Sequence, residues 1–155
     1  MPLPSLPVPA PRADILLVED SAKDVRLIRE VLSEQGGAHQ LHVARDGSQA
    51  LRMLLGEPQG EPPLRPDLVF MDVNLPKLNG PEVLSRIKEN PALKSLPVLM
   101  LSTSRAERDV ADCYARHANG YLVKPSSYDD FAELMACTLR YWLGLSRLPP
   151  KAVPP

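Results

Sequence analysis

One stretch decides the fold of this chain: Leu68-Val-Phe-Met-Asp-Val-Asn-Leu-Pro-Lys-Leu-Asn-Gly80. It begins with four apolar residues, as a strand buried on both faces of a sheet requires. The apolar run stops at Asp72, and the turn residues Asn74, Pro76 and Asn79-Gly80 follow. A strand that ends in this way places the Asp72 carboxylate at the carboxyl edge of its sheet, where open α/β folds bind their ligands.

The same alternation of strand and helix patterns extends from this stretch towards both ends of the chain. Short apolar runs predict strands over 15–18, 41–44, 68–71, 98–101 and 121–123. Apolar positions at helical spacing follow each strand, over 25–32, 50–55, 83–87 and 110–117, and from Ser127 or Tyr128 to beyond Trp142. Ser21, with Asp24 three residues further on, predicts a capping-box-like start for the first of these helices. This alternation predicts an α/β fold with one parallel sheet, right-handed crossovers and helices on both faces. In the fourth helix we expect a buried face made by Val110, Cys113, Tyr114 and His117.

Length and composition limit the class of protein. With 155 residues, the chain suits one domain, which we expect over 13–148, between a disordered Pro-rich leader (1–12) and a flexible tail (149–155). A formal net charge of -1 argues against a nucleic-acid partner, and no apolar run is long enough for a membrane span. Cys113 and Cys137 both fall in helix patterns, so we expect reduced thiols rather than a disulfide, and a cytoplasmic protein.

Polar side chains gather where the predicted strands end, because all strands of a parallel sheet end at the same edge. The first strand ends at Glu19 and Asp20, and the third at Asp72 and Asn74. The fourth ends at Ser102 and Thr103, and the fifth at Lys124. Carboxylates about 4 Å apart repel one another by several kcal/mol at an effective dielectric near 20. A bound divalent cation would explain why they are gathered together.

Mg²⁺ suits this set of ligands, because it prefers oxygen and commonly uses one or two carboxylates together with a phosphate. Asp20 and Asp72 would be direct ligands, Glu19 would act mainly through water, and Asn74 would offer its backbone carbonyl. Mn²⁺ or Ca²⁺ would be substitutes for it.

A phosphoryl group fits beside that cation. Lys124 would neutralise its charge, Ser102 would donate a hydrogen bond, and Asp72 would be the nucleophile that forms an aspartyl-phosphate. Taken singly, the acidic pair at 19–20 could be a solvated turn and the serines at 102–104 a helix cap. Their joint placement at the ends of successive strands favours the functional interpretation.

The sequence resembles the receiver domain of two-component response regulators, from about residue 14 to residue 145. The motifs that carry this resemblance are Leu17-Val-Glu-Asp20, Phe70-Met-Asp-Val-Asn-Leu-Pro76, Val98-Leu-Met-Leu-Ser102 and Gly120-Tyr-Leu-Val-Lys-Pro125. The resemblance implies a flavodoxin-like (βα)5 fold with strand order 2-1-3-4-5. One departure is mild: Asn79-Gly80 stands where the family often has Asp-Gly.

The same resemblance implies a role for each site residue. Asp72 would be the phosphoacceptor, Lys124 the phosphoryl-binding lysine and Ser102 the switch hydroxyl that follows the phosphoryl group. Tyr121 would be the aromatic switch that turns inward when Ser102 moves. The Thr103 backbone N–H would also touch the phosphoryl group. The family usually has a cis Lys-Pro bond, so the resemblance predicts a cis bond between Lys124 and Pro125.

A narrower resemblance concerns partners. The run Ser102-Thr-Ser104, the run Asn119-Gly-Tyr121 and the tail bearing Tyr141-Trp-Leu143 are similar to those of stand-alone receivers that partner phytochrome-type histidine kinases. It implies a sensor histidine kinase as phosphoryl donor, with a bacteriophytochrome as one candidate. Because the chain ends soon after the fifth helix, we expect output through protein contacts.

The apolar residues of the last helix cover more of its circumference than the one face that packs on the sheet. The remaining apolar surface needs another cover, which predicts a homodimer through the fourth helix, fifth strand and fifth helix. Tyr141 and Trp142 would lie in that interface. The alternative is that the tail over 145–150 covers the far side of the same helix.

Three rival functions remain open from the residues. A haloacid-dehalogenase-like phosphatase also uses a strand-end Asp as nucleophile, but it needs a second acid two residues on, where this chain has Asn74. A flavodoxin-like cofactor binder would need a Gly-rich phosphate loop after the first strand. The third rival is a receiver-like module that never takes phosphate. The receiver domain, a signalling protein rather than an enzyme, accounts for more of these residues than any of the three rivals does.

Overall fold

The middle layer of the molecule is a five-stranded parallel sheet in the order β2-β1-β3-β4-β5. The computed structural model describes residues 12–151. Its strands are β1 (Asp14–Val18), β2 (Gln40–Ala44), β3 (Leu68–Asp72), β4 (Val98–Ser102) and β5 (Gly120–Val123). The predicted fold class and strand order are therefore confirmed, including the central position of the strand that ends at Asp72.

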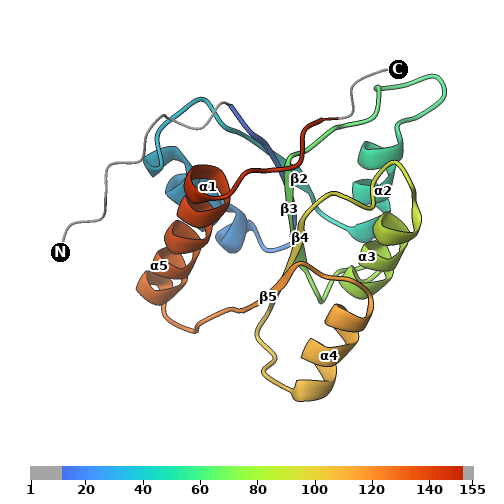
Figure 1. Cartoon of the computed structure of the whole chain (residues 1–155). Coiled ribbons are helices and arrows are strands. Elements are labelled where there is room, and N and C mark those ends of the chain that lie inside the picture. The colour runs from blue at the N-terminus through green and yellow to red at the C-terminus, as the bar shows by residue number, and fades with distance from the viewer. Residues whose placement is uncertain (1–11, 152–155) are drawn as a thin grey trace.

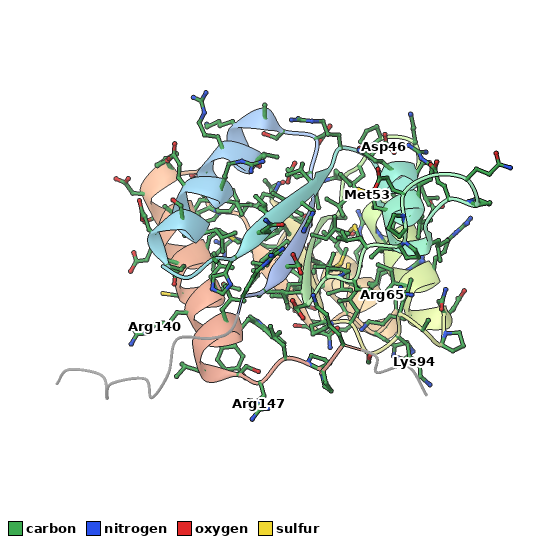
Figure 2. All side chains as sticks on the ribbon, turned by 90° about the horizontal axis from the view of Figure 1, so that it is seen from above. Asp46, Met53, Arg65, Lys94, Arg140 and Arg147 are labelled. Carbon is green, nitrogen blue, oxygen red and sulfur yellow. The ribbon has the colours of Figure 1, made fainter. Side chains whose placement is uncertain are left out.

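Helices cover both faces of this sheet (Figure 1). They are α1 (Ala22–Glu34), α2 (Gly47–Leu55), α3 (Gly80–Glu89), α4 (Glu107–Ala115) and α5 (Tyr128–Leu139), which continues as the π-helical segment η1 (Arg140–Leu145). In Figure 1, α1 and α5 lie on one face, and α2, α3 and α4 lie on the other. Figure 2, seen from above, places Met53 at the α2 side of the molecule and Arg140 and Arg147 at its opposite, α5 side.

The core consists of two apolar layers, one on each face of the sheet. On β1, Ile15 and Leu17 pack in the layer under α1 and α5, whereas Leu16 and Val18 pack in the layer under α2 and α3. All five residues of β3 and of β4 are buried, as their continuous apolar runs predicted. The strand ends that carry the predicted site therefore project from the rigid centre of the molecule.

Side-chain caps fix where most helices begin. Ser21, Asp46, Asn79 and Ser127 each precede a helix, and each accepts a hydrogen bond from the backbone N–H three residues further on. The predicted starts near Ser21 and Ser127 are confirmed. Helix α4 differs, because its N-cap residue is Ala106 and makes no side-chain cap bond.

The predicted buried face of the fourth helix is wrong in part. Of the residues in α4, Cys113 alone is buried, and Tyr114 is 50% exposed. The helix ends at Ala115, and His117 follows in the left-handed region at φ 71°, so its exposed side chain no longer shares the helical face. Both Cys113 and Cys137 are free thiols, as expected.

The described C-terminus lies at the edge of the sheet where the strands begin. Lys151 Nζ lies 2.8 Å from Asp14 Oδ2 and 3.6 Å from Asp67 Oδ2, which joins the last described residue to the starts of β1 and β3. The predicted leader falls outside the described residues except for Arg12, and the last four residues of the predicted tail also fall outside them. Within 12–151, no helix has the length and apolar character needed to cross a membrane.

Candidate metal and phosphoryl site

Three carboxylates meet at the edge where the strands end. One oxygen each from Glu19, Asp20 and Asp72 lies within 4.8 Å of the others. Glu19 and Asp72 are buried, whereas Asp20 is exposed at the mouth of the site. Glu19 and Asp20 directly follow β1, and Asp72 is the last residue of β3, so these groups meet because the two strands are parallel neighbours in the sheet. The structure thus brings together the carboxylates that the sequence predicted as metal ligands.

Lys124 is the cation of this cluster. It follows β5, at the far side of β4, and its Nζ lies 2.7 Å from Glu19 Oε2, 3.0 Å from Asp24 Oδ2 and 3.6 Å from Asp72 Oδ2. Burial lowers the pKa of Lys124, but its hydrogen bond to Glu19 and the charges of Glu19 and Asp72 outweigh burial and raise the pKa. Lys124 is therefore charged at neutral pH and partly neutralises the acidic groups.

The Asp72 carboxylate is oriented by the loop that follows it. The backbone N–H of Asn74 donates to Asp72 Oδ1 at 3.2 Å, while Oδ2 is the oxygen nearest Lys124. The Asn74 side chain is exposed, which leaves its backbone as the part that contacts the site. Asp72 is 6% exposed, whereas its neighbour in the cluster, Asp20, is exposed, so the cluster borders solvent on the Asp20 side.

Burial is the main perturbation of Glu19. Together with the charge of Asp72, burial raises the pKa of Glu19 to about 7, although the hydrogen bond from Lys124 acts in the opposite direction. Because Glu19 holds a proton part of the time near neutral pH, the metal-free site carries less negative charge than its number of carboxylates suggests. A cation in this site would favour the ionised form and displace that proton.

Cation affinity should therefore depend on pH. Below pH 7 Glu19 is mostly protonated, and a cation must displace this proton when it binds. We therefore expect the Kd for Mg²⁺ to be about tenfold higher at pH 6 than at pH 8. Titration calorimetry in buffers of different ionisation enthalpy would measure both the affinity and the released proton. Glu19→Gln should bind more weakly and with a flatter pH dependence. Equal affinities of the unmodified protein at pH 6 and pH 8 would contradict this expectation.

The predicted hydroxyl and aromatic residues lie on the far side of the site. Ser102 is the last residue of β4 and is buried, and its Oγ accepts a hydrogen bond from the Ser104 N–H at 3.0 Å. Thr103 is exposed at the rim. Tyr121 is half-buried, and its hydroxyl donates to the Ser104 carbonyl at 3.0 Å instead of pointing at Asp72.

Sequence reasoning missed one member of the site and erred on one bond. Asp24 contacts Lys124, although its sequence position indicated only a helix start.

The predicted cis bond before Pro125 is wrong, because residues 12–151 contain no cis peptide bond. The trans form is favoured by about 0.5–1 kcal/mol at an ordinary X-Pro bond. With this trans bond, Lys124 still reaches Glu19 and Asp72.

The donor set fits a small, hard cation. Carboxylate oxygens of Asp20 and Asp72 and the Asn74 carbonyl are ligands that Mg²⁺ prefers, and the exposure of Asp20 leaves room for the waters that Mg²⁺ keeps. Neither cysteine nor histidine contributes to the cluster, which disfavours a zinc site.

Comparison with known proteins agrees with this geometry. The sequence model of the response regulator receiver domain matches residues 15–136. The response regulator Rcp1 of Synechocystis sp. is 43% identical over 135 residues, which cover 87% of this chain and 92% of Rcp1. The probable methanogenesis regulatory protein FilR2 of Methanothrix harundinacea is 38% identical over 87% of this chain and 86% of its own length.

Solved structures of relatives share the whole fold. The Mn²⁺-bound form of Rcp1 superposes with a TM-score of 0.85 at 42% identity, covering 89% of this chain and 99% of the other. The phosphorylated cyanobacterial phytochrome response regulator RcpA gives a TM-score of 0.86 at 38% identity, covering 90% and 99%. This chain therefore belongs to the response regulator receiver domain family. The family model that matches this chain is that of the receiver domain and not that of the phosphatase alternative.

Proposed function

We propose that this chain accepts a phosphoryl group on Asp72 from a sensor histidine kinase and passes the signal on through protein contacts. The observation that carries this proposal is the arrangement around Asp72, where a buried carboxylate lies 3.6 Å from the Lys124 ammonium and beside two more carboxylates. The relatives add support, because one was crystallised with Mn²⁺ and another in its phosphorylated form.

In the proposed reaction, an Asp72 oxygen attacks the phosphorus of a phosphohistidine. The new P–O bond forms as the P–N bond breaks, and the bonding electron pair leaves with the imidazole nitrogen. Lys124 neutralises charge on the phosphoryl oxygens, and the Ser102 hydroxyl and Thr103 N–H donate hydrogen bonds to them. Asp20, Asp72, the Asn74 carbonyl and, through water, Glu19 would hold Mg²⁺, for which Mn²⁺ or Ca²⁺ would substitute. A bound cation would supply further neutralisation of the phosphoryl charge.

The direct test uses acetyl phosphate as a small phosphoryl donor. With Mg²⁺ present, intact mass should show a phosphate-sized gain for the unmodified protein and for the control Asp129→Asn, which alters an exposed carboxylate on α5. Asp72→Asn should show no gain. A gain that persists in Asp72→Asn would rule out Asp72 as acceptor. We also expect no sustained turnover of a phosphomonoester, since a receiver takes one equivalent and stops.

We propose a phytochrome-type histidine kinase as donor and a cytoplasmic site of action. Support for this donor comes from RcpA, which is described as a phytochrome response regulator. The test is a competition experiment, in which equal amounts of kinases from the phytochrome class and from an unrelated class transfer phosphate to this chain. Equal transfer rates from both classes would contradict this donor.

We propose a homodimer through α4, β5 and α5, with Tyr141 and Trp142 in the interface. Three exposed side chains, Cys137, Tyr141 and Leu145, follow one another at intervals of four residues along α5 and η1. Tyr141 is 53% exposed, whereas Trp142 and Leu148 pack partly against the core, so the tail covers part of the helix and leaves this stripe open.

Sedimentation at tens of micromolar should show a dimer. Tyr141→Glu should raise the dimer Kd by at least about tenfold, because tyrosines are enriched among the interface hot spots, which contribute about 2 kcal/mol or more. Leu55→Glu is the matched control, because Leu55 is equally exposed, at 55%, but lies on α2 at the opposite face of the sheet. A monomer at this concentration would contradict the proposed dimer.

A further inference from the structure

Ser104, in the loop between β4 and α4, makes contacts in three directions. Its backbone N–H donates to Ser102 Oγ at 3.0 Å, and its carbonyl accepts from the Tyr121 hydroxyl at 3.0 Å. Its own hydroxyl donates to Asp109 Oδ2 at 2.5 Å and accepts from the Ala106 N–H at 3.2 Å. One half-buried residue therefore joins the last residue of β4, the aromatic ring on β5 and the first turn of α4.

The first turn of α4 depends on these contacts more than the start of any other helix does. The other four α-helices begin with a capping side chain, but Ala106 cannot cap α4. The Ser104 hydroxyl anchors this start from outside the helix, since it accepts from the N–H of the N-cap residue Ala106 and donates to Asp109 on the first turn. Cys113 is the one buried residue of α4, so core packing holds this helix weakly.

The other end of α4 is attached separately. Arg116 Nη1 donates to Ser85 Oγ at 3.0 Å on α3, and Arg116 Nε donates to Asp112 at 3.1 Å. The two ends of α4 thus have independent attachments, one to the loop that begins at Ser102 and one to the neighbouring helix. A change at Ser102 can reach the first turn while the last turn stays in place.

We infer that Ser104 is a positioning residue that couples the Ser102 hydroxyl to the first turn of α4. The inference rests on the proposed function, in which the Ser102 hydroxyl donates to a phosphoryl group on Asp72. In that role Ser102 follows the phosphoryl group, and its movement either draws the Ser104 N–H along or breaks the bond from this N–H to Ser102 Oγ. Both outcomes move Ser104, and through its hydroxyl they change the contact with Asp109. Phosphorylation thereby alters the order of the first turn of α4.

Hydrogen exchange of the full chain tests this coupling. In the unmodified protein, treatment with acetyl phosphate and Mg²⁺ should change exchange of the amides over 106–112 by about fivefold, the effect of one hydrogen bond of about 1 kcal/mol. In Ser104→Ala, intact mass should show the same phosphate gain, but exchange over 106–112 should be equal with and without phosphate. Ser104→Thr keeps a hydroxyl and should restore the change.

Ser85→Ala is the matched control at the other end of α4. It should speed exchange near Arg116 in both states and leave the phosphate-dependent change over 106–112 intact. A phosphate-dependent change that persists in Ser104→Ala, or a phosphorylated unmodified protein with no change, would overturn the coupling alone. No phosphate gain in the unmodified protein would overturn the proposed function and the coupling with it.

Discussion

Replacing Lys124 with methionine should destabilise the metal-free protein by about 3–5 kcal/mol, the usual cost of removing one partner from a buried ion pair. The Lys124 side chain is 10% exposed, and it contacts Glu19, of which 1% is exposed. Methionine keeps the volume of the lysine stem but leaves Glu19, Asp24 and Asp72 without their cation. Urea unfolding at pH 8 in the presence of EDTA would measure the loss.

Added Mg²⁺ should restore part of this stability, because it supplies positive charge at the same carboxylates, and the variant should gain more from Mg²⁺ than the unmodified protein does. Lys151→Met is the matched control. Lys151 also pairs with two aspartates, but its side chain is 46% exposed, and such a pair contributes less than about 1 kcal/mol. Similar losses for the two variants would show that the Lys124 cluster is not special.

Gly80→Ala should slow phosphoryl acceptance from acetyl phosphate by about a hundredfold, the cost of misplacing a reacting group by about 1 Å. A Cβ on Gly80 would lie 2.2 Å from the Asp72 carbonyl oxygen and 2.9 Å from the Val73 Cα, so the loop after β3 must move. Helix propensity favours alanine over glycine, by about 1 kcal/mol in a helix interior, so a loss at this first residue of α3 would be diagnostic of the steric contact.

The matched control for Gly80 is Gly60→Ala, in the loop before β3. There the nearest atom to a new Cβ is Glu57 Oε2 at 2.9 Å, the far end of a flexible side chain that can move away. Acceptance followed by intact mass over time should be unchanged in Gly60→Ala. An acceptance rate in Gly80→Ala equal to that of the unmodified protein would mean that the loop adapts without moving the carboxylate.

The sheet and most of the site could be predicted because both follow from local pattern and one topological rule. The run over 68–71 is apolar throughout, and a parallel arrangement brings the residues after each strand to a common edge. That rule is enough to place Glu19 beside Asp72 and Lys124. Residues that cap helices, such as Ser21 and Ser127, were also recognisable from their neighbours in sequence.

The features that escaped prediction depend on packing between distant segments. Asp24 faces Lys124 because α1 begins beside the end of β5, which no spacing within either segment indicates. Tyr114 fits the helical period of α4 but lies on its exposed side, and Cys113 is the one residue of this helix that is buried. The uncapped start at Ala106 likewise gains its role only from Ser104 in the folded protein.

The contact of Lys151 with Asp14 has a practical consequence for reporter fusions. Arg12 and Lys151, the two ends of the described chain, both lie at the pole where the strands start, whereas Asp72 lies at the opposite pole. A fluorescent protein joined directly at Arg12 or Lys151 would be anchored at the pole opposite the Asp72 carboxylate. Labels placed at these positions should therefore leave the carboxylate cluster uncovered.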